Sequence, residues 1–207
     1  MALGGIDAGR GGKGMNGKGW YLESVVSGGQ TGADQAGICA AKFLNYNTGG
    51  RVPKGFLTEL GSEPWLAEFG CSETASTSYR SRTWANVQWA DSVVIFTPEV
   101  LTWETTAGKK KAIARRADLT SALEAGRFTT EMAFDAYDLT PGSRYTADLA
   151  KAHNRPLCIN PVQEDQLRAF LYEHGTKTLM VAGSRESKAE GIYRWVYDFL
   201  VEALVPF

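Results

Sequence analysis

The residues from Leu22 to Leu44 constrain the fold most, because they join an apolar run, a glycine-rich turn and a helical pattern. The apolar run LESVV is typical of a short buried strand. SGGQTGAD (27–34) follows, and small or apolar residues then recur at helical spacing. A strand, a glycine turn and a helix N-terminus favour anion binding, since backbone N–H groups and the helix dipole point out of the turn. We therefore expect a phosphate-bearing ligand at residues 27–34.

The size and composition of the chain set limits on its class. Its 207 residues are enough for one α/β domain with a substantial core. We expect a flexible glycine-rich leader at 1–20 and a single domain at 21–207. The net charge of −1 argues against a general nucleic-acid binder. No apolar run reaches the roughly 20 residues of a membrane span, and three widely spaced cysteines suggest neither disulfides nor a zinc cluster, so we expect a reduced, cytoplasmic protein.

Strand and helix patterns alternate along most of the chain. This alternation predicts an α/β, Rossmann-like, doubly wound and mainly parallel sheet flanked by helices. The predicted strands after the first are 92–96, 156–159 and 178–182, with a short one around 69–73; the predicted helices are 79–91, 146–153, 165–173 and an amphipathic one from Ile192 to Leu204.

Two segments interrupt this alternation. Asn47 to Gly50 (NTGG) has the composition of a turn. Residues 98–139 carry the main basic cluster, Lys109 to Arg116, and otherwise helix-compatible sequence. We expect this second segment to be an insertion of one or two short helices within the domain.

Three turns of small residues, at 27–34, 141–146 and 183–187, each follow a predicted strand or begin a helix. Turns after parallel strands share one edge of the sheet, where ligands of such sheets bind. The first turn has neither the Gly-Lys-Ser/Thr of a P-loop nor the spacing GxGxxG. The candidate ligand-binding residues in these turns are Gly28, Gly29, Gln30, Thr31, Gly32, Asp34, Gly142, Ser143, Thr146, Gly183, Ser184, Arg185 and Glu186.

Arginines near these turns suit an anionic ligand, because a guanidinium binds phosphate in a bidentate manner. Arg80, Arg82 and Lys54 complete the set of cations, and Asn86 or Glu186 would contact hydroxyls or a base edge. Glu186 is equally suited to capping the last helix. The two histidines lie at predicted helix ends, so no catalytic residue and no metal site is assigned.

Four ordered motifs resemble the putative molybdenum carrier family, a branch of the Rossmann-like SLOG superfamily. They are SGGQTGAD (27–34), PKG (53–55), YRSRTWANVQWADSVVIF (79–96) and VAGSRESKAEGIY (181–193). The resemblance implies a Rossmann-like fold and a nucleotide-like or pterin-phosphate ligand, so a nucleotide derivative or molybdenum cofactor is the expected cofactor or cargo.

Two departures from this resemblance bear on function. The family's GGTxLTxxxA turn matches only at Gly142, Thr146 and Ala150, and the segment 98–139 is not expected in other members. In the related Lonely Guy phosphoribohydrolases a catalytic Glu stands where this chain has Leu149, with Asp148 beside it.

The sequence thus leaves two functions open. One is a carrier or sequestering protein that binds a phosphate-bearing small molecule at the carboxyl edge of the sheet. The other is an enzyme that hydrolyses an N-glycosidic or phosphoester bond of a nucleotide derivative, with Asp34, Glu186 or Asp148 as acid or base. The aromatic last helix also predicts a homo-oligomer, and no nucleic-acid or membrane partner is expected.

Overall fold

A six-stranded parallel sheet forms the centre of the computed structural model, which describes residues 21–97, 101–104, 110–113, 139–161 and 163–205. The strands are β1 (Ser24–Ser27), β2 (Asn47–Val52), β5 (Cys71–Glu73), β6 (Ser92–Phe96), β9 (Leu157–Ile159) and β10 (Thr178–Gly183). Their order in the sheet is β5-β2-β1-β10-β6-β9, and every neighbouring pair is parallel. The doubly wound Rossmann-like fold is therefore confirmed.

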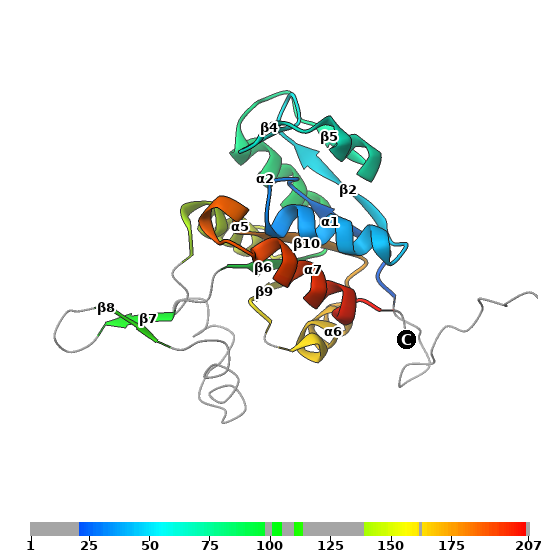
Figure 1. Cartoon of the computed structure of the whole chain (residues 1–207). Helices are drawn as coiled ribbons and strands as arrows, with labels where there is room; N and C mark the ends of the chain where they lie inside the picture. Colours follow the sequence, from blue (N-terminus) through cyan, green and yellow to red (C-terminus); the bar gives the residue numbers. More distant parts are fainter. Residues whose placement is uncertain (1–20, 98–100, 105–109, 114–138, 162, 206–207) are drawn as a thin grey trace, which may run out of the picture.

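Helices cover both faces of this sheet (Figure 1). On one face α1 (Ala33–Phe43), α6 (Glu164–Glu173) and α7 (Ile192–Ala203) pack on alternate strand residues such as Val25, Val94 and Val181. On the other face α2 (Tyr79–Trp89) and α5 (Pro141–Ala152) pack on the intervening residues, such as Val26 and Met180. Because both faces are buried, the strands are apolar without a polar alternation.

The last strand of the chain, β10, lies at the centre of the sheet, directly beside the first strand, β1. The helix after it, α7, packs on α1, and Leu22 and Leu204 belong to the same core cluster. The end of α7 therefore lies close to the start of β1. If the end of α7 were joined to the start of β1, the elements β10, α7 and β1 would follow one another as an ordinary βαβ unit. In this chain β1 comes first and β10 and α7 come last, so the order of elements is circularly permuted relative to that unit.

The segment Asn47–Gly50, predicted to be a turn, belongs instead to β2. Its glycines are explained by crowding between strands, not by a bend. A Cβ on Gly50, whose φ is +150°, would lie 1.8 Å from the carbonyl oxygen of Ser27 on β1. Pattern alone cannot distinguish a turn glycine from a glycine that admits a neighbouring strand.

The start of one helix also differs from the sequence prediction. Helix α5 begins at Pro141 and not at Thr146, because Thr140 caps it by accepting from the N–H of Ser143 and proline fits the first helical position.

In the described part of 98–139, β7 (Leu101–Glu104) and β8 (Lys110–Ile113) form an antiparallel pair, which corrects the expected helices at those residues. The rest of that segment and the leader at 1–20 lie outside the described residues.

Smaller elements connect β2 to β5. They are the pair β3 (Leu57–Thr58) and β4 (Gly61–Ser62), and the 3-10 helix η1 (Pro64–Phe69). A second 3-10 helix, η2 (Glu186–Lys188), follows β10. Within the described ranges, no helix is both long and apolar enough to cross a membrane.

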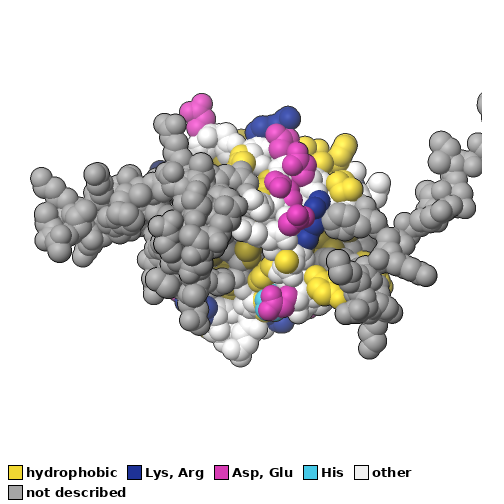
Figure 2. Space-filling model, turned by 90° about the horizontal axis from the view of Figure 1, so that it is seen from below, with side chains coloured by type: hydrophobic (Ala, Val, Ile, Leu, Met, Phe, Trp, Pro, Cys, Tyr) yellow, Lys and Arg dark blue, Asp and Glu magenta, His cyan; other side chains and the backbone are white. Residues whose placement is uncertain are grey.

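The aromatic residues of α7 all contact the core. Trp195 and Phe199 pack edge to face on Phe96, whereas Tyr193 and Tyr197, which are partly buried, stack on each other. Figure 2 shows one face of the molecule, on which acidic side chains form a line with basic ones beside it and apolar side chains stand in separate groups. The homo-oligomer stays a prediction.

Candidate functional site

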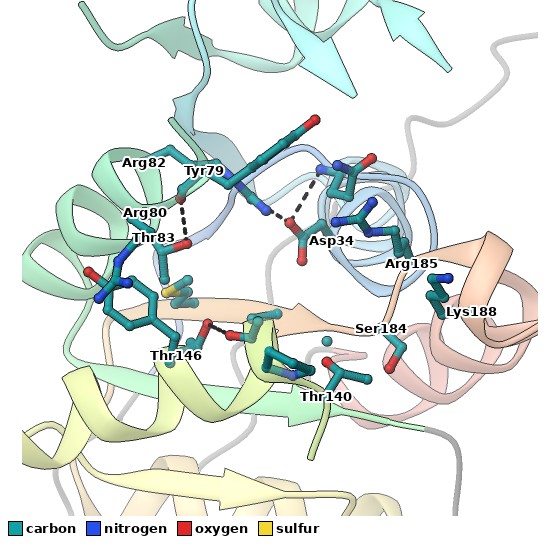
Figure 3. Close-up of a pocket in the computed structure, with 17 residues that line it drawn as sticks. Asp34, Tyr79, Arg80, Arg82, Thr83, Thr140, Thr146, Ser184, Arg185 and Lys188 are labelled. Carbon is teal, nitrogen blue, oxygen red and sulfur yellow. Dashed lines mark hydrogen bonds and ion pairs between the residues drawn. The ribbon is translucent and has the colours of Figure 1, made fainter. Parts of the chain in front are cut away.

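A cleft of about 550 Å³ lies at the carboxyl end of β10, between the first turns of α2 and α5 (Figure 3). The start of α1 and the residues after β10 complete its walls. All three turns predicted from the sequence contribute to it. The lining residues are Gln30, Asp34, Tyr79, Arg80, Arg82, Thr83, Thr140, Pro141, Gly142, Tyr145, Thr146, Met180, Ala182, Gly183, Ser184, Arg185 and Lys188.

An ion pair between Arg82 and Asp34 joins α2 to α1 across this cleft. The guanidinium Nη1 lies 2.6 Å from the carboxylate, and the two side chains are only 12% and 6% exposed. Gly28 leaves room for this pair, since a Cβ there would lie 1.1 Å from Nη1 of Arg82. The first glycine of the turn therefore determines where this cation sits.

The backbone N–H groups of the glycine turn are largely engaged within the turn itself. Those of Gly29, Gln30 and Thr31 donate to Ser27 Oγ, Asp34 Oδ2 and Gln30 Oε1 respectively. The N–H groups of Gly29 and Thr31 thus already have partners, and the expected phosphate cradle at Gly28 to Gly32 stays a prediction. The turn positions the side chains of Gln30 and Asp34, which do line the cleft.

Arg185, from the turn after β10, lines the same cleft as Arg80 and Arg82 of α2. Its side chain is 42% exposed, and its guanidinium lies 5.8 Å from the ring centre of Tyr79. The carboxylate of Glu59, 13% exposed, approaches Arg185 at 3.8 Å and accepts hydrogen bonds from Thr31 Oγ1 and from the N–H and Oγ of Ser187. Although burial alone raises the pKa of Glu59, these hydrogen bonds and the charge of Arg185 lower it overall.

Several lining residues were not named as candidates from the sequence, although they lie in the motifs at 79–96 and 181–193 or in the turn at 141–146. Tyr145 packs under Arg80, whose guanidinium lies 4.3 Å from the ring centre, and Tyr79 lies near both Arg82 and Arg185. Lys188 adds a fourth cation. These aromatic residues come from first turns of two helices that meet only in the folded chain, so no linear spacing could have linked them.

Three buried polar side-chain atoms of this cleft have no hydrogen-bond partner within the described residues. They are Nε2 of Gln30, Nε of Arg82 and Oγ of Ser184. Gln30 and Ser184 are only 5% and 2% exposed. Buried polar atoms are normally paired, and an unpaired one costs about 1–3 kcal/mol. Their gathering in one cleft favours a ligand that would pair with them.

Other predicted site residues have structural roles. Asn86 is fully buried and joins β1 to β2: its Oδ1 accepts from the N–H of Arg51 at 2.7 Å, and its Nδ2 donates to the carbonyls of Arg51 and Ser27. The carboxylate of Glu186 accepts from the N–H groups of Gly191 and Tyr193, so it caps α7. These contacts give Asn86 and Glu186 structural roles, with Glu186 in the capping role that the sequence also predicted; contact of either residue with a ligand stays a prediction.

The remaining predicted residues do not line the cleft. Gly28, Gly29, Thr31 and Gly32 belong to the turn, Ser143 is part of the cap of α5, and Lys54 is an exposed residue. The cleft therefore contains nine of the predicted residues: Gln30, Asp34, Arg80, Arg82, Gly142, Thr146, Gly183, Ser184 and Arg185.

Metal-ligating residues do not gather in the part of the chain that the structure describes. It contains no group of three or more His, Cys, Asp or Glu that could hold a metal ion. Burial raises the pKa of the Cys71 and Cys158 thiols to about 12, which disfavours the thiolate that binds metals. His153 and His174 stand at the ends of α5 and α6.

Comparison with known proteins agrees with this fold. A crystal structure of a "Putative molybdenum carrier protein" from Syntrophus aciditrophicus SB is similar, with a TM-score of 0.67 and 25% sequence identity over 93% of this chain and 99% of that chain. No curated protein matches the chain.

A family model, described as the circularly permutated YpsA SLOG family, matches residues 25–127 and 129–204. The bounds of this match enclose most of 98–139, and the expectation that other members lack this segment stays a prediction. The position of β10 beside β1 agrees with the permutation in the description. The chain belongs to the circularly permutated YpsA SLOG family.

Proposed function

We propose that this protein binds a phosphate-bearing small molecule in the cleft at the carboxyl end of β10, as a carrier or a sequestering protein. The observation that carries this proposal is the set of three buried, unpartnered polar atoms on Gln30, Arg82 and Ser184, all of which line one cleft. A bound ligand with several oxygen atoms would supply the missing partners.

The charge of the cleft supports an anionic ligand. Among the described residues, its lining includes four cationic side chains, Arg80, Arg82, Arg185 and Lys188, and one carboxylate, Asp34. That carboxylate is already paired with Arg82. The first turns of α1, α2 and α5 also contribute lining residues, and helix N-termini favour negative charge.

Two ligand classes fit these features, a nucleotide derivative and the molybdenum cofactor as cargo. Both carry phosphate, for which the arginines and Ser184 are suited. The second class is suggested by the name of the similar protein from Syntrophus aciditrophicus. The described residues suit the phosphate of this cofactor, and they offer no cluster of ligands to its metal.

The carboxylates named for the alternative, a hydrolase, are engaged elsewhere. Asp34 is held by Arg82 and by the N–H of Gln30, and Glu186 caps α7. Asp148 is exposed on α5 and does not line the cleft. Binding without turnover is therefore the function that the described residues favour.

Mass spectrometry of small molecules released from the purified, denatured protein tests the proposal. We expect an unmodified phosphate-bearing compound from the wild-type protein and much less from Arg185→Ala. Arg194→Ala is the matched control, because Arg194 is an exposed arginine paired with Asp198 on α7, outside the cleft. Equal recovery from both variants would contradict the assignment of the cleft, and release of hydrolysis products would favour the enzyme.

A further inference from the structure

A second hollow, of about 600 Å³, lies beside the first two turns of α2, where Arg80, Ser81 and Trp84 line it. Its lining includes the indole of Trp84, the cations Arg51 and Arg80, and the polar side chains of Glu73 and Thr74. Trp84 is 51% exposed, an unusual amount for the largest apolar side chain. The function proposed above leaves this hollow unused.

The two hollows share one wall. Arg80 and Tyr145, which stack at 4.3 Å, line both of them. Trp84 stands four residues after Arg80 on α2, and side chains at this spacing are neighbours on a helix surface, with Cβ atoms about 5–6 Å apart. A ligand that contacts Arg80 from the first cleft is therefore within one helical turn of the Trp84 indole.

The chemistry of the second hollow differs from that of the first. Its lining combines the Trp84 indole with the cations Arg51 and Arg80, and also includes Glu73 and Thr74. Planar nitrogen heterocycles stack on indole rings and on guanidinium planes, and their edges carry hydrogen-bond donors and acceptors. A phosphate alone would gain little from such a surface.

We infer that the ligand carries a planar heterocycle, which stacks on Trp84 in the second hollow while its phosphate lies in the first cleft. This inference rests on the proposed function and restricts its ligand to compounds that join a phosphate to such a ring. Purine nucleotides and phosphorylated pterins both satisfy it, and sugar phosphates do not.

Calorimetric titration of the full chain with four probes tests the inference. AMP, GMP and neopterin monophosphate carry a phosphate and a ring, and ribose 5-phosphate carries the phosphate alone. We expect at least one ring-bearing probe to bind about tenfold or more tightly than ribose 5-phosphate, as one stacked ring contributes. Which probes bind distinguishes a nucleotide from a pterin ligand.

Substitution of Trp84 then locates the ring. We expect Trp84→Ala to abolish the advantage of the ring-bearing probe and to leave binding of ribose 5-phosphate unchanged, whereas Trp84→Phe retains part of the advantage. Phe43→Ala is the control, because Phe43 is an exposed aromatic residue on α1, 65% exposed, that lines neither hollow.

The possible results separate the two proposals. Equal affinity for all four probes, or an advantage that survives Trp84→Ala, would overturn the stacking site and leave the phosphate cleft in place. If no probe binds the wild-type protein, the proposed function fails, and the stacking site with it.

Discussion

Two regions of the cleft differ in whether their polar groups have hydrogen-bond partners. One is the glycine turn at 27–34, and the other is the wall formed by residues of α2 and of the turn after β10, which carries Arg80, Arg82 and Arg185. In the turn, the N–H groups of Gly29, Gln30 and Thr31 all have partners within the turn. In the wall, Arg82 and Ser184 each keep a buried side-chain atom without a partner in the described residues, and in the turn the side chain of Gln30, not its backbone, does the same. Such an atom is costly unless something external pairs with it.

This difference separates folding from binding. The turn is the most recognisable motif in the sequence, and it holds α1, β10 and Arg82 in position. The wall is formed by residues from α2 and from the turn after β10, and it supplies the groups that a ligand could use. Variants of the turn should therefore lower stability, and variants of the wall should lower affinity.

Gly32→Ala should have the largest effect on stability. Gly32 has φ +77° and ψ −128°, a conformation nearly restricted to glycine, and an added Cβ would lie 2.5 Å from the carbonyl oxygen of Ser184. Strain and overlap together should lower the free energy of unfolding by about 3 kcal/mol. Denaturant titration followed by circular dichroism measures it.

Gly191→Ala is the control for Gly32→Ala. Gly191 also has positive φ, +81°, but a Cβ there would meet no atom within 4 Å. Only the cost of the left-handed conformation remains, about 1 kcal/mol. Similar losses in the two variants would show that close packing against the 184–186 backbone is not what requires Gly32.

Arg82→Ala should have the second largest effect, because Arg82 belongs to both regions. Among the described residues, its removal leaves the buried carboxylate of Asp34 with only the N–H of Gln30 as a partner. We expect the free energy of unfolding to fall by about 2 kcal/mol, less than for a fully buried pair since water can enter the cleft. Thermal and denaturant unfolding measure it, with Arg194→Ala, an exposed pair, expected within about 0.5 kcal/mol of wild type.

Glu59→Gln should have a smaller effect that depends on pH. The carboxylate accepts hydrogen bonds from Thr31 and Ser187, and its pKa is lowered in the folded protein. A lowered folded pKa gives stability that is present above the unfolded pKa and is lost as pH falls through the folded pKa. We therefore expect wild type to exceed the variant by about 1 kcal/mol at pH 7, and the difference to shrink below about pH 4.3.

Unfolding curves of the wild-type protein and Glu59→Gln, recorded from pH 3 to pH 7, provide the measurement. The titration of carboxylates that both proteins share contributes equally to both free energies of unfolding, so it cancels when one is subtracted from the other at each pH. A difference that stays constant over this range would mean that the charge of Glu59 contributes nothing to joining the β3–β4 connection to the two turns.

Arg185→Ala should have the smallest effect on stability. The side chain is 42% exposed and its nearest carboxylate, Glu59, is 3.8 Å away, so the free energy of unfolding should change by less than about 0.5 kcal/mol. The same variant should lose most of its affinity for the ligand. A loss of stability comparable to that of Arg82→Ala would place Arg185 with the turn and not with the wall.

Much of the fold could be predicted because its signals are local. The strand Ser92–Phe96 and the helix from Ile192 were expected at almost their observed positions, since an apolar run and a 3.6-residue period each report burial directly. The sequence did not predict β2, because its glycine Gly50 is required by the close approach of the neighbouring strand β1 and not by a turn. The predicted start of α5 was too late, because Thr140 caps the helix and Pro141 occupies its first position.

The site was predictable in position and less so in composition. Nine candidates line the cleft, because turns after parallel strands share an edge. Asn86 and Glu186 have the right chemistry but pair with backbone groups of other segments. Glu59, Tyr79 and Tyr145 were not named as candidates, since their contacts join residues distant along the chain.

By itself the sequence determined the alternation of strands and helices, the edge of the sheet at which the turns meet, and the family. The tertiary structure decided which polar groups are satisfied. Hydrogen bonding within the glycine turn engages its backbone, whereas Arg82, Gln30 and Ser184 keep unpaired atoms in the cleft. The physical reason is that burial and pairing depend on the three-dimensional neighbours of an atom, and a linear pattern specifies only some of them.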